Sequence, residues 1–280
     1  MSVSRGLVLG GGGVTGIAWE TGLLYGLQEA GVDLTTADRV VGTSAGSVVG
    51  AQLTTGAPLA ELYERQLLPP QPGPVAAIGL RVLLGFAWAM LRARGDLEDF
   101  GRRIGRWSVD RAAAGHTPTL AARYEAVRAR LTTFDWPAKG RLVITAVDVE
   151  TGRLRAFDGA DGVSLLDAVV ASCAVPGVYP PVPIGGKTYV DGGARSGSNA
   201  DLALDCARVV ALTPVDRAAG PMKSARQWLG DRPSVVVSPD RASVDAIGRN
   251  VLDPARRAAS ARAGRAHAAA VAAELRALWG

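Results

Sequence analysis

Three groups of residues have the types and spacing needed for acyl transfer. Ser44 lies within Gly-Thr-Ser-Ala-Gly, flanked two residues away by Gly42 and Gly46. Glycines at these places let a strand turn sharply into a helix and present the serine hydroxyl as a nucleophile. Four glycines at 10–13 offer unshielded N–H groups of the kind that bind an oxyanion, and Asp191 begins Asp-Gly-Gly, where a carboxylate can serve as a base. The sequence therefore predicts a serine nucleophile, a carboxylate base and a backbone oxyanion hole.

Each group follows a predicted strand. Apolar residues 6–9, 39–41 and 187–190 lead into the glycine run, the serine turn and Asp191 respectively. Further strands are predicted at 141–148, 154–157, 208–212 and 234–237. Helices are predicted at 14–27, 48–68, 96–130, 167–172 and 253–279. Residues 174–183 carry four prolines, which favour an irregular, rigid loop.

The chain has two histidines, and neither is placed to complete a serine-histidine-aspartate triad. His116 lies at a predicted helix end and His267 within the C-terminal helix, whereas Ser44 follows a strand. We therefore expect Asp191 to accept the serine proton without an imidazole between them. Each motif taken alone also occurs as an ordinary turn, so the prediction rests on their combination.

The glycine run also fits a dinucleotide-binding pattern, with Gly11, Gly13 and Gly16 as Gly-x-Gly-x-x-Gly. That interpretation requires an acidic residue at the end of the second strand to bind a ribose, but the strand at 39–41 runs into Gly-Thr-Ser. A phosphate-binding P-loop is excluded because no Gly-Lys-Ser/Thr follows the glycines. An oxyanion loop is favoured.

Composition narrows the class further. The 280 residues are 48% hydrophobic, enough for one core, so we predict a single domain over 1–280 with a helical insertion at 69–140 and a C-terminal helix at 253–280. The net charge of +5 comes mainly from arginines without interleaved aromatics, which argues against nucleic-acid binding and allows peripheral contact with an anionic membrane. Cys173 and Cys206 have neither disulfide nor metal spacing, so no metal or other cofactor is expected, and a cytoplasmic location fits.

Residues 75–91 are almost wholly apolar but are interrupted by Arg81. This stretch is shorter than the roughly 20 residues needed to span a bilayer. A helix packed in the core or at a self-association surface is favoured over an exposed flap that meets lipid.

Four blocks of sequence resemble the patatin-like phospholipase family. They are Gly-Gly-Gly-Gly-Val-Thr-Gly at 10–16, Gly-Thr-Ser-Ala-Gly-Ser at 42–47, Ala-Ser-Cys-Ala-Val-Pro-Gly-Val-Tyr-Pro-Pro-Val at 171–182, and Asp-Gly-Gly at 191–193. Their order and spacing cover about two thirds of the chain. One departure is Thr15, where family members usually carry a cation; Trp19 likewise stands where a histidine is frequent.

The resemblance implies a three-layer α/β fold with a central, mainly parallel sheet flanked by helices. It also implies hydrolysis of acyl esters in lipids by a phospholipase, lysophospholipase or carboxylesterase, with Ser44 as nucleophile, Asp191 as base and the N–H groups of Gly11, Gly12 and Gly13 as oxyanion hole. An acyltransferase using the same dyad is the main alternative, and a dinucleotide-binding oxidoreductase is a weaker one. The substrate is expected to be a lipid or other acyl ester. The uncharged Thr15 makes esterase chemistry a firmer expectation than phospholipid specificity.

Overall fold

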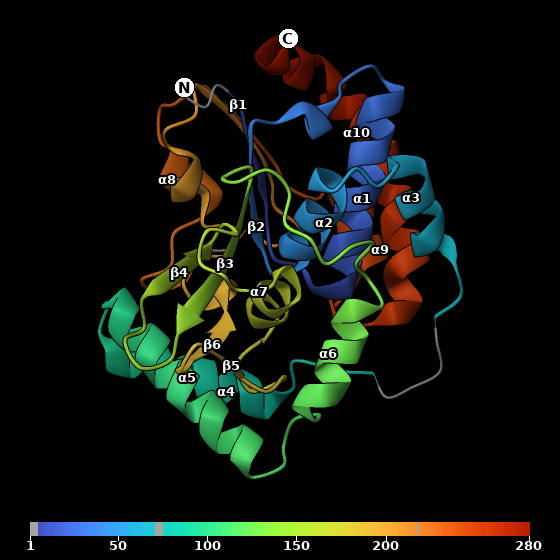
Figure 1. Cartoon of the computed structure of the whole chain (residues 1–280). Coiled ribbons are helices and arrows are strands. Elements are labelled where there is room, and N and C mark those ends of the chain that lie inside the picture. The colour runs from blue at the N-terminus through green and yellow to red at the C-terminus, as the bar shows by residue number, and fades with distance from the viewer. Residues whose placement is uncertain (1–4, 71–74, 217) are drawn as a thin grey trace.

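An eight-stranded mixed sheet forms the centre of the computed structural model, which describes residues 5–70, 75–216 and 218–280 (Figure 1). The strand order is β5-β6-β3-β2-β1-β7-β8, with β4 also paired to β3. The strands from β3 through β2, β1 and β7 to β8 are parallel, whereas β4, β5 and β6 run antiparallel to their neighbours. The bounds are β1 Arg5–Leu9, β2 Arg39–Thr43, β3 Leu142–Asp148, β4 Leu154–Phe157, β5 Val182–Ile184, β6 Lys187–Asp191, β7 Arg208–Leu212 and β8 Ser234–Val237.

Helices cover both faces of this sheet. Their bounds are α1 Gly13–Glu29, α2 Ala45–Thr54, α3 Leu59–Leu67, α4 Leu80–Ala93, α5 Leu97–Ala113, α6 Leu120–Arg128, α7 Leu165–Ser172, α8 Ala225–Leu229, α9 Arg241–Ile247 and α10 Arg257–Trp279. In β1, Leu7 and Leu9 join the large core that holds residues of α1, α2, α7 and α10, while Val8 joins the cluster that holds residues of α8. This alternation follows from the two-residue period of a strand. The predicted α/β class, with a mixed and mainly parallel sheet between helical layers, is confirmed.

Close packing of α1 on α10 sets the direction of the helix that follows the glycine loop. A side chain at Gly22 would meet the Ala261 carbonyl oxygen at 2.0 Å, and one at Gly264 would meet the Trp19 carbonyl oxygen at 2.2 Å. Only glycine permits such an approach of two backbones. The C-terminal helix therefore supports the first helix of the fold, although it carries no residue of the predicted site.

Three predictions of secondary structure need correction. The helix predicted at 48–68 is two helices, α2 and α3, because Pro58 begins a new helix as the N-cap of α3. The region 96–130 is likewise divided into α5 and α6 by a turn at Gly115, whose φ of 72° only glycine adopts easily. The irregular loop predicted at 174–183 ends in β5, where Pro183 is tolerated because β5 lies at the sheet edge.

The apolar stretch at 75–91 forms α4 near the lower end of the molecule in Figure 1. One face of α4 packs inward through Val82 and Phe86, as the core interpretation predicted. The other face is exposed, so that interpretation holds for only half of the helix. Residues 71–74, near the start of the insertion predicted at 69–140, lie outside the described residues. The single-domain organisation with an insertion at 69–140 stays a prediction.

No helix within the described residues is both long and apolar enough to cross a bilayer.

Candidate active site

Ser44 sits on the sharp turn that joins β2 to α2. Its φ of 52° lies in the left-handed region, which is strained for a residue other than glycine. The glycines on either side are required by close approach: a Cβ at Gly46 would lie 2.0 Å from the Leu9 carbonyl oxygen, and one at Gly42 would lie 2.6 Å from the Gly46 carbonyl oxygen. The strand, sharp turn and helix predicted around Ser44 are confirmed.

Two residues at the C-terminal end of α7 hold this strained turn through hydrogen bonds to the Ser44 backbone. The N–H of Ser44 donates to Oγ of Ser172 at 2.9 Å, and the thiol of Cys173 donates to the Ser44 carbonyl at 3.3 Å. Ser47, one turn into α2, also donates its hydroxyl to that carbonyl at 2.6 Å. With its own backbone held in this way, Ser44 keeps its side chain available for chemistry. From the sequence alone, the only indication of these hydrogen bonds is that Ser172 and Cys173 belong to the block at 171–182.

Strand pairing brings Asp191 to Ser44 across 147 residues of chain. Thr43 pairs with Thr145 of β3, and Asp191 pairs with the next residue of that strand, Ala146. The Ser44 side chain lies near enough to the Asp191 carboxylate to lower its pKa. The structure therefore brings the two predicted catalytic side chains together, although neither lies near the other in sequence.

Burial tunes the Asp191 carboxylate. The side chain is almost completely buried, and this desolvation raises its pKa to about 6. Three neighbours act to lower that pKa. They are the Gly193 N–H, which donates to Oδ1 at 2.7 Å, the Ser44 side chain and the positive charge of Arg123. Asp191 is thus mainly ionised at neutral pH but basic enough to accept a proton, as general-base catalysis requires.

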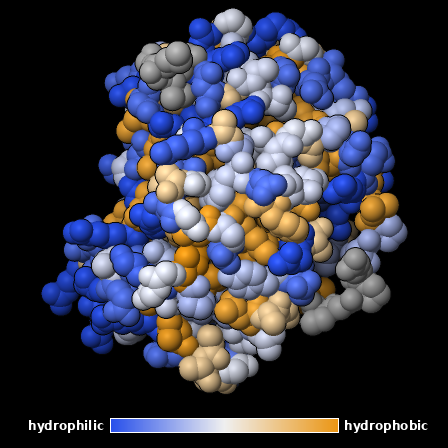
Figure 2. All heavy atoms as spheres, in the orientation of Figure 1, coloured by the Kyte–Doolittle hydropathy of each residue, from blue (hydrophilic) through white to orange (hydrophobic). Residues whose placement is uncertain are grey.

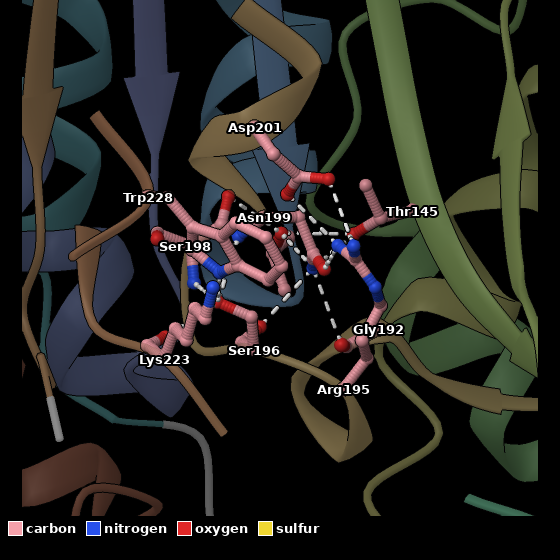
Figure 3. Close-up of polar contacts among 10 residues, drawn as sticks. Thr145, Gly192, Arg195, Ser196, Ser198, Asn199, Asp201, Lys223 and Trp228 are labelled. Carbon is pink, nitrogen blue, oxygen red and sulfur yellow. Dashed lines mark hydrogen bonds and ion pairs between the residues drawn. The ribbon is translucent and has the colours of Figure 1, made fainter. Parts of the chain in front are cut away.

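Asn199 links the side chain of Thr43, which precedes Ser44, with the backbone of Gly192, which follows Asp191; Figure 3 shows its contacts with Thr145 and Gly192. Its amide nitrogen lies 3.1 Å from Oγ1 of Thr43, 3.3 Å from Oγ1 of Thr145 and 3.2 Å from the carbonyl oxygen of Gly192. Asn199 itself has a φ of 49° and accepts a hydrogen bond from Arg195. Sequence reasoning missed this residue, because a single buried asparagine carries no distinctive pattern.

The glycine loop lies directly beside Ser44. A Cβ at Gly11 would be 3.6 Å from the Cβ of Ser44. The N–H of Gly11 donates to the Gly197 carbonyl at 2.7 Å, so Gly11 is occupied in holding the loop rather than free as the predicted oxyanion donor. The N–H groups of Gly12 and Gly13 find no hydrogen-bond acceptor in the described part of the chain. They lie at the N-terminus of α1, where unpaired donors and the helix dipole favour negative charge.

A cavity of 20 Å³ adjoins Ser44. Gly13, Val175 and Leu252 form part of its wall, together with Arg123, Arg130 and Tyr179. Neither histidine contributes to this wall; His267 packs instead against Trp19, with ring centroids 6.1 Å apart. Among the described residues, no group of three or more histidine, cysteine, aspartate or glutamate side chains could hold a metal ion.

Comparisons with known proteins agree with the motifs of the site. A family model described as "Patatin-like phospholipase" matches residues 7–72 and 77–204. Two proteins named lysophospholipase nte1, from Aspergillus niger and Aspergillus oryzae, are each 45% identical over 62 residues. These alignments span 22% of this chain and only 4% of either relative.

Two solved structures are similar over 98% of this chain. VipD from Legionella pneumophila is 13% identical with a TM-score of 0.49, and 67% of that chain is covered. The type III effector protein ExoU is 18% identical with a TM-score of 0.41, and 53% of that chain is covered.

Proposed function

Because this chain belongs to the patatin-like phospholipase family, we propose that it hydrolyses acyl esters of lipids, with Ser44 as nucleophile and Asp191 as general base. The observation that carries the proposal is that strand pairing sets the strained Ser44 beside the buried Asp191 carboxylate. The family's members are serine lipid acyl hydrolases. Because the curated relatives are matched over so small a part of their length, the activity of this chain is inferred from the family and the site together.

Each residue of the site has a defined part in the proposed reaction. Asp191 takes the hydroxyl proton of Ser44 as Oγ attacks the acyl carbonyl carbon, and the carbonyl oxygen becomes an oxyanion. The oxyanion is stabilised by the free N–H groups of Gly12 and Gly13. Asp191 then returns the proton to the departing alkoxide, which leaves an acyl-enzyme on Ser44. In the second half, Asp191 deprotonates a water that attacks this ester and releases the fatty acid and the free serine.

The names of the relatives indicate the chemical class of the substrate. The two Aspergillus proteins are named lysophospholipases, which supports a glycerophospholipid or lysophospholipid ester as substrate. An acyltransferase would use the same dyad, with an alcohol replacing water in the second half of the reaction. Product analysis with and without glycerol distinguishes the two, since only a transferase forms acylglycerol.

Labelling with a fluorophosphonate, followed by mass mapping of the modified peptide, tests the nucleophile directly. We expect one phosphonylated residue, Ser44, because its hydroxyl is the one activated by a buried base. Asp191→Asn should slow labelling strongly, whereas Asp240→Asn, a helix N-cap at α9 that can still cap as asparagine, should label like the wild type. Modification of another serine would remove Ser44 from the mechanism.

The outer face of α4 supports a lipid surface as the place where substrate is met. We define this α4 outer face as Leu80, Leu83, Leu84, Trp88 and Leu91, whose exposed fractions run from 46% for Trp88 to 77% for Leu91. Hydrophobic residues also gather in the centre and lower part of the view in Figure 2, where Figure 1 places α4, α7, β5 and β6. A helix that is apolar on both faces requires a second partner, and exposed apolar patches of this kind mark interaction sites.

Charge favours an anionic membrane as that partner. The 31 residues at 65–95 contain four arginines and no aspartate or glutamate. The inner face of α4 packs through Val82 and Phe86 on Val175, Tyr179 and Leu252, which also form the wall of the Ser44 cavity. A cavity of 20 Å³ has room for about one water molecule, so an acyl chain enters only if this wall moves. Contact of α4 with lipid would move the part of the wall that α4 packs against and so open the cavity to an acyl chain.

Co-sedimentation with vesicles of phosphatidylglycerol and phosphatidylcholine tests this contact. We expect Leu84→Glu combined with Trp88→Glu to weaken vesicle binding at least about tenfold. The double change removes two apolar side chains that would insert into the lipid, and it adds negative charge that an anionic surface repels. Hydrolysis of vesicle lipid should fall more than hydrolysis of a soluble ester. Val244→Glu, on the exposed face of α9, is the matched control. Unchanged vesicle binding would contradict the proposal, and dissociation of a dimer by the double variant without any vesicle binding would assign the face to self-association.

A further inference from the structure

Two arginines beside Ser44 have no carboxylate partner at ion-pairing distance among the residues that the structure describes. Arg123, on α6, is 5% exposed; it donates one hydrogen bond to the Cys173 carbonyl at 3.3 Å and lies 3.9 Å from the centroid of the Tyr179 ring. Its Nε is buried without a hydrogen-bond partner. Arg130 follows α6 and borders the same cavity, and within the described residues its side chain forms neither a hydrogen bond nor a salt bridge. Both guanidinium groups are therefore available to a ligand.

The positive charge continues outward from the cavity. A groove of 540 Å³ shares Val14, Ile17 and Arg130 with the Ser44 cavity and is lined further out by Arg65 and Arg257. No aspartate or glutamate is among the described residues that line either space. The cavity and the groove are thus bordered together by four arginines and, among the described residues, by no carboxylate.

Holding these charges together is unfavourable without a ligand. Burial and the nearby positive charge of Arg123 both lower the pKa of Arg130, and Arg257 adds to this effect. Desolvated like charges destabilise a fold unless an opposite charge compensates them. The charge of Arg123 lowers the pKa of Asp191, but the Asp191 carboxylate accepts its hydrogen bond from the Gly193 N–H, and no salt bridge joins it to Arg123. An anion bound between the arginines would remove the imbalance.

We propose that Arg123 and Arg130 form a binding site for a phosphate-type oxyanion near Ser44, on the side where Arg130 also lines the 540 Å³ groove and an anion has the room that the 20 Å³ cavity lacks. A guanidinium presents planar, paired N–H donors that match the oxygens of a phosphate, and the unpartnered Nε of Arg123 is one such donor. The inference rests on the proposed hydrolase function and narrows it: the favoured ester carries a phosphate a few bonds from the acyl group. Thr15, in the first turn of α1, carries no charge, so α6 and the turn that follows it supply the cations of the site.

A comparison of two soluble esters tests the site. Dibutyryl glycerophosphate and dibutyrylglycerol differ only by the phosphate, and both are used below the concentration at which they aggregate, so that α4 plays no part. We expect Arg130→Gln to reduce kcat/KM for the phosphate ester about 10- to 100-fold more than for the neutral ester, the range for a lost hydrogen bond to a charged group. Arg130→Lys should restore part of the difference because it keeps the charge but not the fork.

A matched control lies two residues before Arg130, at the last residue of α6. Arg128→Gln removes the same charge from α6 at an exposed position paired with Glu125, and it should leave the ratio of the two esters unchanged. Equal losses on both esters in Arg130→Gln, or no loss on either, would overturn the proposal. Arg130 is preferred to Arg123 as the test position because Arg123 also packs on Tyr179 and its removal would disturb the fold.

Adding inorganic phosphate shows whether the site binds free phosphate or only the phosphate of the substrate. Its effect on Tm does not depend on turnover. If free phosphate occupies the site, it inhibits hydrolysis of the neutral ester and raises Tm in the wild type and in Arg128→Gln, but not in Arg130→Gln. If only the substrate's own phosphate is bound, the ester ratio changes without these effects. Absence of both responses would overturn the site. Should neither ester be hydrolysed while phosphate still raises Tm through Arg130, the hydrolase function fails and the anion site stands.

Discussion

Ser44→Ala and Asp191→Asn are each expected to lower kcat/KM for a short-chain p-nitrophenyl ester by at least about 10⁴-fold, the scale seen when one member of such a catalytic unit is removed. The first change removes the attacking oxygen. The second keeps the shape of the side chain and an acceptor for the Gly193 N–H, but an amide cannot take the serine proton. The loss should therefore appear in kcat, with Tm close to that of the wild type.

Two controls separate this outcome from general damage. Ser108→Ala alters a buried serine whose hydroxyl only bonds back to Ile104 within α5, and Asp240→Asn alters a helix cap far along the chain. Both should keep activity within a few-fold of the wild type. Because the two members of a dyad act together, the double variant Ser44→Ala with Asp191→Asn should be no worse than either alone. Additive losses, or turnover retained by either single variant, would exclude the dyad.

The parts of the site that were predictable are those written in short stretches of sequence. The turn at Ser44 follows from Gly42 and Gly46, since each glycine answers a local steric requirement. The strand before Asp191 follows from its apolar run. Their meeting through β3 depends on strand pairings between residues 102 apart (Thr43 and Thr145) and 45 apart (Ala146 and Asp191), which no local pattern specifies. The lack of a suitably placed histidine, together with the family resemblance, suggested that they meet.

The residues that escaped prediction owe their roles to tertiary packing. Arg123 and Arg130 read as ordinary arginines of a charged helix, and only the packing of α6 beside Tyr179 and the Cys173 carbonyl buries the first of them. The occupied N–H of Gly11 likewise depends on the distant Gly197 carbonyl. The sequence gives the type of residue at each of these positions, but it does not show which distant group each residue contacts.

Gly12→Ala is expected to lower kcat about 100- to 1,000-fold, because it would displace the proposed oxyanion donors. The φ of 175° at Gly12 does not itself exclude alanine. The obstacle is space: the added Cβ would lie 2.6 Å from Cβ of Pro214 and 2.9 Å from Cα of Gly16, so the loop must shift. Gly79→Ala is the matched control, since a Cβ there meets open space and its φ is −74°.

The distribution of the loss between kcat and KM decides what the loop does. Donors aimed at the developing oxyanion bind the transition state more tightly than the neutral ester, so their displacement lowers kcat and leaves KM nearly unchanged. A loop that only shaped the acyl pocket would instead raise KM. Steady-state kinetics of Gly12→Ala on a soluble ester, with Tm measured alongside, separates the two. Activity within about threefold of the wild type would show that the N–H groups at the start of α1 do not stabilise the intermediate.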